Sequence, residues 1–85
     1  MRVTLVTTDA CHLCDDARQA VAEFASGFPL QVELIDAGSP SGRRLLAAHR
    51  AGMLPLVLLD GEYVSAGRLS RGKLRQLLQQ RAVRA

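Results

Sequence analysis

The spacing of the apolar residues changes twice within the first 36 residues, and this change restricts the possible folds more than any other feature of the chain. Residues 2–7 (RVTLVT) are short and rich in Val and Thr, which predicts a buried strand. From Cys11 onward the apolar residues recur at helical spacing, until Gly27 and Pro29 end the pattern. Residues 30–36 return to a two-residue alternation, the period of a strand. A strand, a helix and a strand in this order predict a parallel strand pair with a right-handed crossover.

Capping residues predict two further helices. Ser39 stands directly before a proline, which is tolerated in the first turn, so the sequence predicts a helix from Pro40 to Arg50. Ser70 can cap a last helix, with Leu69 and Leu74 in the two positions of a hydrophobic staple.

A hairpin is predicted between these two helices. Residues 55–59 form an apolar run, Asp60-Gly61 is a strong two-residue turn, and residues 62–65 are expected to return antiparallel. The predicted order is therefore β-α-β-α-β-β-α. This order places the chain in the α/β class, with a four-stranded mixed sheet and three helices on its faces.

Length and hydropathy predict a single domain spanning residues 1–85. The longest apolar run, residues 54–59, is far shorter than the roughly 20 residues of a membrane span. The apolar run at residues 3–6 is also too short for a secretory signal. We therefore expect a cytoplasmic, monomeric protein without a membrane partner.

Charge is distributed unevenly along the chain. Of the 11 basic residues 2 lie in residues 1–36 and 9 after them, whereas the 8 acidic residues divide as 6 and 2. A basic half can indicate nucleic-acid binding, but here no aromatic stacking platform accompanies it and several arginines fall on predicted helices. Solvated helix faces explain the charge better, and we expect no nucleic-acid partner.

The two cysteines require a chemical explanation. A disulfide between Cys11 and Cys14 closes too short a loop to stabilise a fold strongly, and cytosolic thiols are normally reduced. Cys11 stands at the predicted start of a helix, where free N–H groups and the helix dipole stabilise a thiolate. Cys14 follows about one turn later. The spacing predicts Cys11 as the nucleophile and Cys14 as the resolving thiol. His12 between them can tune the pair by stabilising the adjacent thiolate when it is protonated, or it can be an ordinary exposed residue at the helix start.

Two other roles for the cysteine pair remain open. Cys11 and Cys14 can supply two zinc ligands, with His12 or His49 as further donors. His12 is too close in sequence to both cysteines for easy simultaneous coordination, and His49 ends another predicted helix. The pair can also hold an iron–sulfur cluster together with glutathione and a second subunit, or it can be an inert buried pair. Placement after a strand and at a helix start favours redox chemistry.

Residues 7–14 (TTDACHLC) and Met53-Leu54-Pro55 resemble the glutaredoxin branch of the thioredoxin-fold superfamily, especially its short members with Cys-His-Leu-Cys. The resemblance covers nearly the whole chain and implies a thioredoxin-like fold. It also implies a thiol–disulfide oxidoreductase that acts on protein disulfides or glutathionylated thiols. Such an enzyme holds no bound cofactor, and glutathione is a possible reductant or co-substrate. The resemblance further implies a cis-proline at Pro55, with substrate docking along Leu54 and Pro55.

The chain departs from glutaredoxins where they bind glutathione. They place a lysine or arginine three residues before the first cysteine, where this chain has Thr8. They have threonine and valine before the cis-proline, where this chain has Met53 and Leu54. These departures predict weak glutathione affinity.

The segment before the last helix departs as well. The paired glycines and acidic residues of glutaredoxins correspond to Ser65-Ala66 and Arg68-Leu69, so one expected charge is reversed. We expect Gly67 and Arg68 to contribute to substrate binding. Arg68, Arg71 and Lys73 can hold a carboxylate at the amino end of the last helix, although each can also be an ordinary solvated charge.

Overall fold

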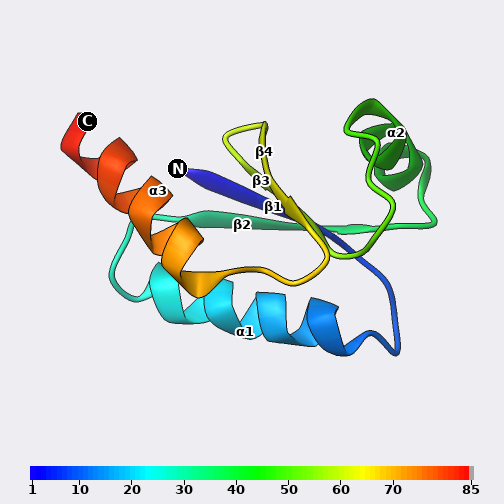
Figure 1. Ribbon diagram of the computed structural model, residues 1–85, viewed down its shortest axis with the longest axis horizontal. Helices are drawn as coiled ribbons and strands as arrows, with labels where there is room; N and C mark the ends of the chain where they lie inside the picture. The colour runs from blue at the N-terminus through cyan, green and yellow to red at the C-terminus, as the bar shows by residue number, and fades with distance from the viewer. Residues whose placement is uncertain (85) are drawn as a thin grey trace.

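The computed structural model describes residues 1–84 and has the predicted order of elements (Figure 1). The elements are β1 (Arg2–Thr7), α1 (His12–Ala25), β2 (Gln31–Asp36), α2 (Pro40–Ala48), β3 (Leu56–Leu59), β4 (Glu62–Ala66) and α3 (Arg71–Arg84). The strands form one sheet in the order β2-β1-β3-β4, with β1 parallel to β2 and the other neighbours antiparallel. The predicted mixed sheet is confirmed, and the boundaries differ from the predicted ones by one or two residues.

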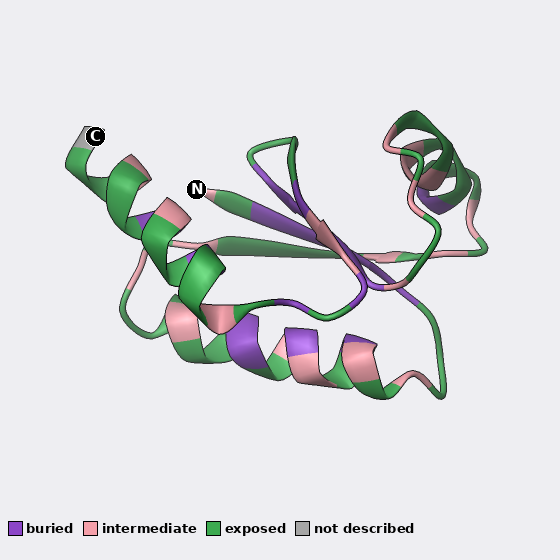
Figure 2. Ribbon diagram, in the orientation of Figure 1, coloured by how far each residue is buried: buried purple, intermediate pink, exposed green. Residues whose placement is uncertain are grey.

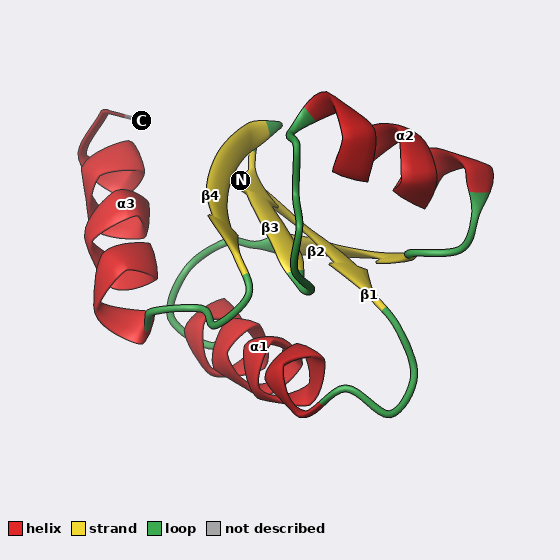
Figure 3. Ribbon diagram, turned by 45° about the vertical axis from the view of Figure 1, so that its right-hand side comes forward, coloured by secondary structure: helices red, strands yellow, loops and turns green. Residues whose placement is uncertain are grey.

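The helices cover the two faces of the sheet (Figures 1 and 3). Helices α1 and α3 share one apolar cluster with the sheet, and α2 packs against the other face. Figure 2 shows the buried residues concentrated in β1, in β3 and on the side of α1 that faces the sheet. The larger cluster consists of Val3, Leu5, Ala17, Ala20, Val21, Val57, Leu59, Val64, Leu69, Leu74 and Leu78. Aliphatic side chains therefore build the core, as the composition requires.

The predicted turn and caps are present. Asp60 and Gly61 both have positive φ, 49° and 84°, as a two-residue hairpin turn with the twist of the strands requires. The hydroxyl of Ser39 accepts a 3.0 Å hydrogen bond from the N–H of Gly42, which caps α2. The hydroxyl of Ser70 likewise accepts one of 3.2 Å from the N–H of Lys73 and caps α3.

Gly42 lets α2 lie directly against the end of β2. A Cβ at this position would overlap the carbonyl oxygen of Asp36 and would lie 3.1 Å from the Cα of Ala37. Since both neighbours are backbone atoms, a larger residue could not be accommodated by a change of rotamer. The close approach of α2 to β2 therefore requires a glycine.

Strand β2 lies at the edge of the sheet and is largely exposed. Its alternation predicted a strand correctly, but Val32 and Leu34 keep 46% and 56% of their surface exposed. The reason is the position of α1, which packs against β1. Within residues 1–84, no helix has the length and apolar character needed to cross a membrane.

Candidate active site

Cys11 stands between the end of β1 and the start of α1, as the N-cap of the helix. Its backbone is extended, with φ −128° and ψ 106°, and its carbonyl oxygen accepts the first helical hydrogen bond, 3.0 Å from the N–H of Asp15. The Sγ atom of Cys11 accepts a 3.1 Å hydrogen bond from the N–H of Cys14. This N–H is one of the donors that the first turn of a helix leaves without a main-chain partner. The sulfur of Cys11 therefore occupies the position at which a helix start stabilises an anion.

Cys11 and Cys14 form a disulfide, with their Cα atoms 5.2 Å apart. The two cysteines differ in burial: Cys14 is completely buried, whereas Cys11 is partly exposed. An external thiol or disulfide can therefore approach Cys11 more readily than Cys14. The sequence predicts Cys11, the more accessible of the two, as the nucleophile.

A groove of about 500 Å³ lies between the start of α1 and the start of α3. We call it the α1–α3 groove. It is lined by His12, Leu13, Asp16, Arg68, Leu69 and Arg71. The structure thus brings together two of the predicted site residues, His12 and Arg68, which are 56 positions apart in the sequence.

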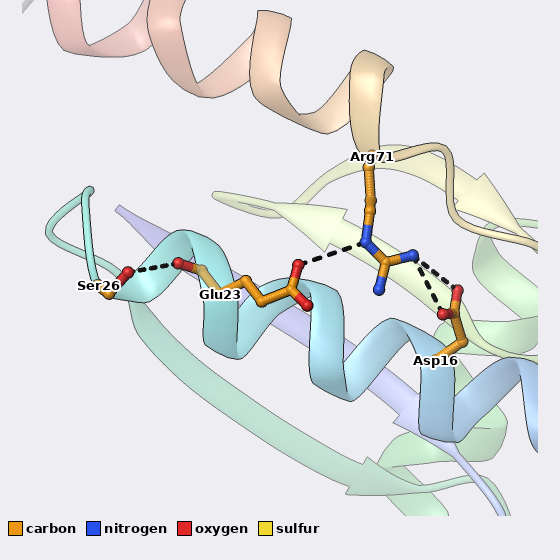
Figure 4. A network of polar contacts seen from close by, with 4 residues as sticks. All are labelled: Asp16, Glu23, Ser26 and Arg71. Atoms are coloured by element: carbon orange, nitrogen blue, oxygen red, sulfur yellow. Dashed lines mark hydrogen bonds and ion pairs between the residues drawn. The ribbon is translucent and has the colours of Figure 1, made fainter.

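An ion-pair network joins the two walls of this groove (Figure 4). The Nη1 atom of Arg71, the first residue of α3, lies 3.1 and 3.2 Å from the two carboxylate oxygens of Asp16 on α1. Its Nε atom lies 3.5 Å from Oε2 of Glu23, further along α1. These carboxylates raise the pKa of Arg71, chiefly through the hydrogen bond with Asp16. The sequence does not predict this network, because no local pattern relates α1 to α3.

Arg71 and Lys73 are therefore engaged within the chain. Lys73 donates a 2.6 Å hydrogen bond from Nζ to the carbonyl oxygen of Val64. The prediction that both cations can hold a substrate carboxylate did not anticipate these internal partners. Arg68 differs from them, since it lines the groove and forms no ion pair with any of residues 1–84.

The segment before β3 contains the predicted substrate-docking residues Leu54 and Pro55. The peptide bond between Leu54 and Pro55 is cis, and the carbonyl oxygen of Pro55 accepts a 3.0 Å hydrogen bond from the N–H of Gly67. Gly67 has φ 97°, a conformation that favours glycine. The side chain of Met53, 59% exposed, lies over this glycine, with its terminal carbon 3.4 Å from where a Cβ would be.

The main chain of Leu54 has no partner strand among the described residues. Among residues 1–84, neither its N–H nor its carbonyl takes part in a main-chain hydrogen bond between elements or in a turn. Leu54 itself is half-buried and lies just before β3. An extended polypeptide could pair with such a segment through its own main chain.

The described part of the chain contains no set of ligands for the zinc site that the sequence left open as an alternative. Residues 1–84 contain no group of three or more His, Cys, Asp or Glu side chains close enough to hold a metal ion. His49 is the C-cap of α2, and its ring stacks on that of Tyr63 with the centroids 6.3 Å apart.

The family model for the glutaredoxin-like domain (DUF836) matches residues 2–79. The chain belongs to this family. Among solved structures, this glutaredoxin-like domain is similar to a mutant thioredoxin from Halobacterium salinarum NRC-1, with a TM-score of 0.67 and 22% sequence identity. The match covers 93% of this chain and 72% of the thioredoxin chain, and it shows a shared thioredoxin-like fold. A comparison with curated proteins finds no match.

The family, the fold and the disulfide at the start of α1 together support a redox function for this glutaredoxin-like domain.

Proposed function

We propose that this glutaredoxin-like domain is a thiol–disulfide oxidoreductase that acts by dithiol exchange. The observation that carries the proposal is the asymmetry of the cysteine pair. Cys11 is partly exposed and its sulfur accepts the N–H of Cys14, whereas the side chain of Cys14 is completely buried. A stabilised, accessible sulfur next to a protected one is the arrangement that exchange through a mixed disulfide needs.

The reaction proceeds in two exchanges. The thiolate of Cys11 attacks one sulfur of the substrate disulfide, so that a Cys11–substrate disulfide forms and the other substrate sulfur leaves as a thiolate. Cys14 then loses its proton and attacks Cys11, which forms the Cys11–Cys14 disulfide and releases the second substrate thiol. Two electrons pass from the protein to the substrate. An external thiol, either glutathione or a thioredoxin-type protein, must return them.

Three features support docking of the substrate beside Cys11. The main chain of Leu54 offers an N–H and a carbonyl to an extended segment, and Pro55 leads into the adjoining strand. Gly67 holds the Pro55 carbonyl and leaves room for the exposed Met53. Arg68 provides a cation in the α1–α3 groove for a substrate carboxylate.

His12 is proposed to tune the reaction. It is the exposed first residue of α1 and lies between the cysteines, where a protonated imidazole favours the neighbouring thiolate. The substrates we propose are protein disulfides and glutathionylated thiols. No cofactor needs to be bound for either exchange.

The test is the reduction of a glutathionylated peptide, in which the rate of release of the free peptide is measured. One reaction contains glutathione alone as the reductant, and a second contains a thioredoxin-type reducing system. Turnover with either reductant that disappears in Cys11→Ser supports the proposal and identifies the reductant. Absence of turnover with both, together with a coloured, iron-containing protein after anaerobic purification, would replace it with cluster binding.

A further inference from the structure

Asp16 places a negative charge on the helix whose start must stabilise a thiolate. It follows Cys11 by five residues, which is about 7.5 Å along the axis of α1. It lines the same groove as His12 and Leu13, the two residues between the cysteines. An uncompensated carboxylate at this distance opposes the ionisation of a thiol.

Arg71 compensates this charge in the structure. Its Nη1 atom contacts both oxygens of Asp16, at 3.1 and 3.2 Å, which ties the carboxylate to a cation from another element. The position of Arg71 is itself informative. It is the first residue of α3, where the dipole of its own helix disfavours a cation, so that its partners on α1 must offset this cost.

We propose that Arg71 is a positioning residue of the exchange reaction, which acts through Asp16 to keep Cys11 in its reactive thiolate form. The inference rests on the proposed function of Cys11 as the nucleophile. Arg71 does not need to touch the substrate for this role. Its guanidinium holds the Asp16 carboxylate and cancels most of the field that the carboxylate would otherwise exert on the sulfur.

Within residues 1–84, neither of the other two carboxylates close to Cys11 in the chain, Asp9 and Asp15, pairs with α3. Asp15 pairs with Arg18 on the same helix, and this pair does not involve α3. Glu23 also contacts Arg71, but it follows Cys11 by twelve residues, or about 18 Å along the axis. The charged and titratable groups in the first two turns of α1, the first turn of α3 and the segments that lead into them are Asp9, His12, Asp15, Asp16, Arg18, Arg68, Arg71 and Lys73. Of the carboxylates among them, Asp16 is the one that α3 neutralises.

The test measures the pKa of Cys11 directly, from thiolate absorbance against pH in a Cys14→Ser background at low salt. Arg71→Gln should raise this pKa by about 0.4 units, the effect of one carboxylate about 8 Å away through water. At a pH below the pKa, the thiolate fraction and the alkylation rate should therefore fall about 2.5-fold. Arg71→Lys should restore most of the difference, because it keeps the charge.

Three matched variants separate this role from a merely structural one. Glu23→Gln removes the distant partner of Arg71 and should leave the pKa of Cys11 unchanged. Arg75→Gln removes a cation one turn further along α3, where the guanidinium lies 5.5 Å from the ring centre of Phe24, and should also change nothing. Adding Asp16→Asn to Arg71→Gln should bring the pKa back to its starting value.

His12 lies one turn from Asp16 and, when protonated, can donate to the carboxylate that Arg71 releases, so the series is repeated in a His12→Gln background. An Arg71→Gln variant whose Cys11 pKa is unchanged in both backgrounds would overturn the inference. An equal rise in the presence and absence of Asp16 would overturn it as well. If Cys11 formed no mixed disulfide with substrate in any of the variants, the proposed function itself would be contradicted.

Discussion

The main-chain N–H of Cys14 donates a hydrogen bond of 3.1 Å to the Sγ atom of Cys11. The donor belongs to the backbone of residue 14, so it does not depend on the side chain there. A variant that lacks the second thiol therefore keeps the interaction that stabilises the first. The same contact couples the ionisation of Cys11 to the integrity of the first turn of α1.

We predict that Cys11→Ser abolishes disulfide exchange, whereas Cys14→Ser accumulates a mixed disulfide on Cys11. The reason is that Cys14 is buried, and the proposed mechanism gives it only the resolution of the intermediate. Mass spectrometry after incubation with a glutathionylated peptide would detect the adduct. Limiting iodoacetamide should label Cys11 first, with a rate that rises with pH and a midpoint below the free value of about 8.5. Preferential labelling of Cys14 would reverse the assignment.

We predict that Thr8→Lys strengthens binding of glutathione several-fold. Thr8 is exposed, just before the loop that leads to Cys11, and it stands where glutaredoxins carry a cation. One additional charge-assisted contact contributes about 1 kcal/mol, and the gain should shrink as salt is added. Calorimetric titration with glutathione at low and high salt measures both effects. Thr8→Gln is the matched control, and an equal gain in that variant would rule out the charge as the cause.

We predict opposite effects of alanine at two helical glycines. Gly42→Ala forces a Cβ into the backbone of Asp36 and should destabilise the fold by at least about 2 kcal/mol. Gly72→Ala places its Cβ 3.9 Å from the nearest atom and should stabilise α3 by about 0.5–1 kcal/mol. Urea denaturation followed by circular dichroism gives both free energies of unfolding. Equal stability of the two variants would show that α2 can move away from β2.

We predict that Ser39→Ala lowers the free energy of unfolding by about 1 kcal/mol, because it removes the cap of α2. The hydroxyl of Ser39 accepts from Gly42 and donates to the carbonyl oxygen of Asp36 at 2.7 Å. Ser41→Ala, on an exposed position of the same helix, is the control and should have little effect. Because alanine has a higher helix propensity than serine, Ser41→Ala should not destabilise α2. A loss in this control as large as that in Ser39→Ala would show that the loss does not come from the cap.

The sequence predicts this fold well where the signals are local. The spacing of apolar residues after Cys11 indicates α1, and Asp60-Gly61 specifies the hairpin, because both depend on neighbours a few positions away. The caps at Ser39 and Ser70 are predicted for the same reason. The exposure of Val32 and Leu34 on β2 is not predicted, because a two-residue period indicates a strand but does not indicate that the strand lies at an edge of the sheet.

The site is predictable to a similar extent. The cysteine pair and its helix start follow from residues close together in the chain, and the fold places Arg68 in the groove beside His12 as a candidate substrate contact. Arg71 is an example of what the sequence does not predict. From the sequence alone it is a solvated cation or a cation that binds a substrate carboxylate, whereas its pairing with Asp16 depends on how α3 packs against α1. Contacts of this kind arise from tertiary packing and leave no pattern in a single sequence.

The position of β1 between β2 and β3 has a consequence for synthesis on the ribosome. Residues 2–36 contain a complete parallel pair, but the second edge of β1 is covered only when Leu56–Leu59 arrives and pairs with residues 3–6. Until then a growing chain carries an apolar strand with one open edge, which is a template for pairing with other chains. We expect nascent chains stalled shortly after Asp36 to associate with holding chaperones, and chains that include the hairpin through Ala66 to be released from them.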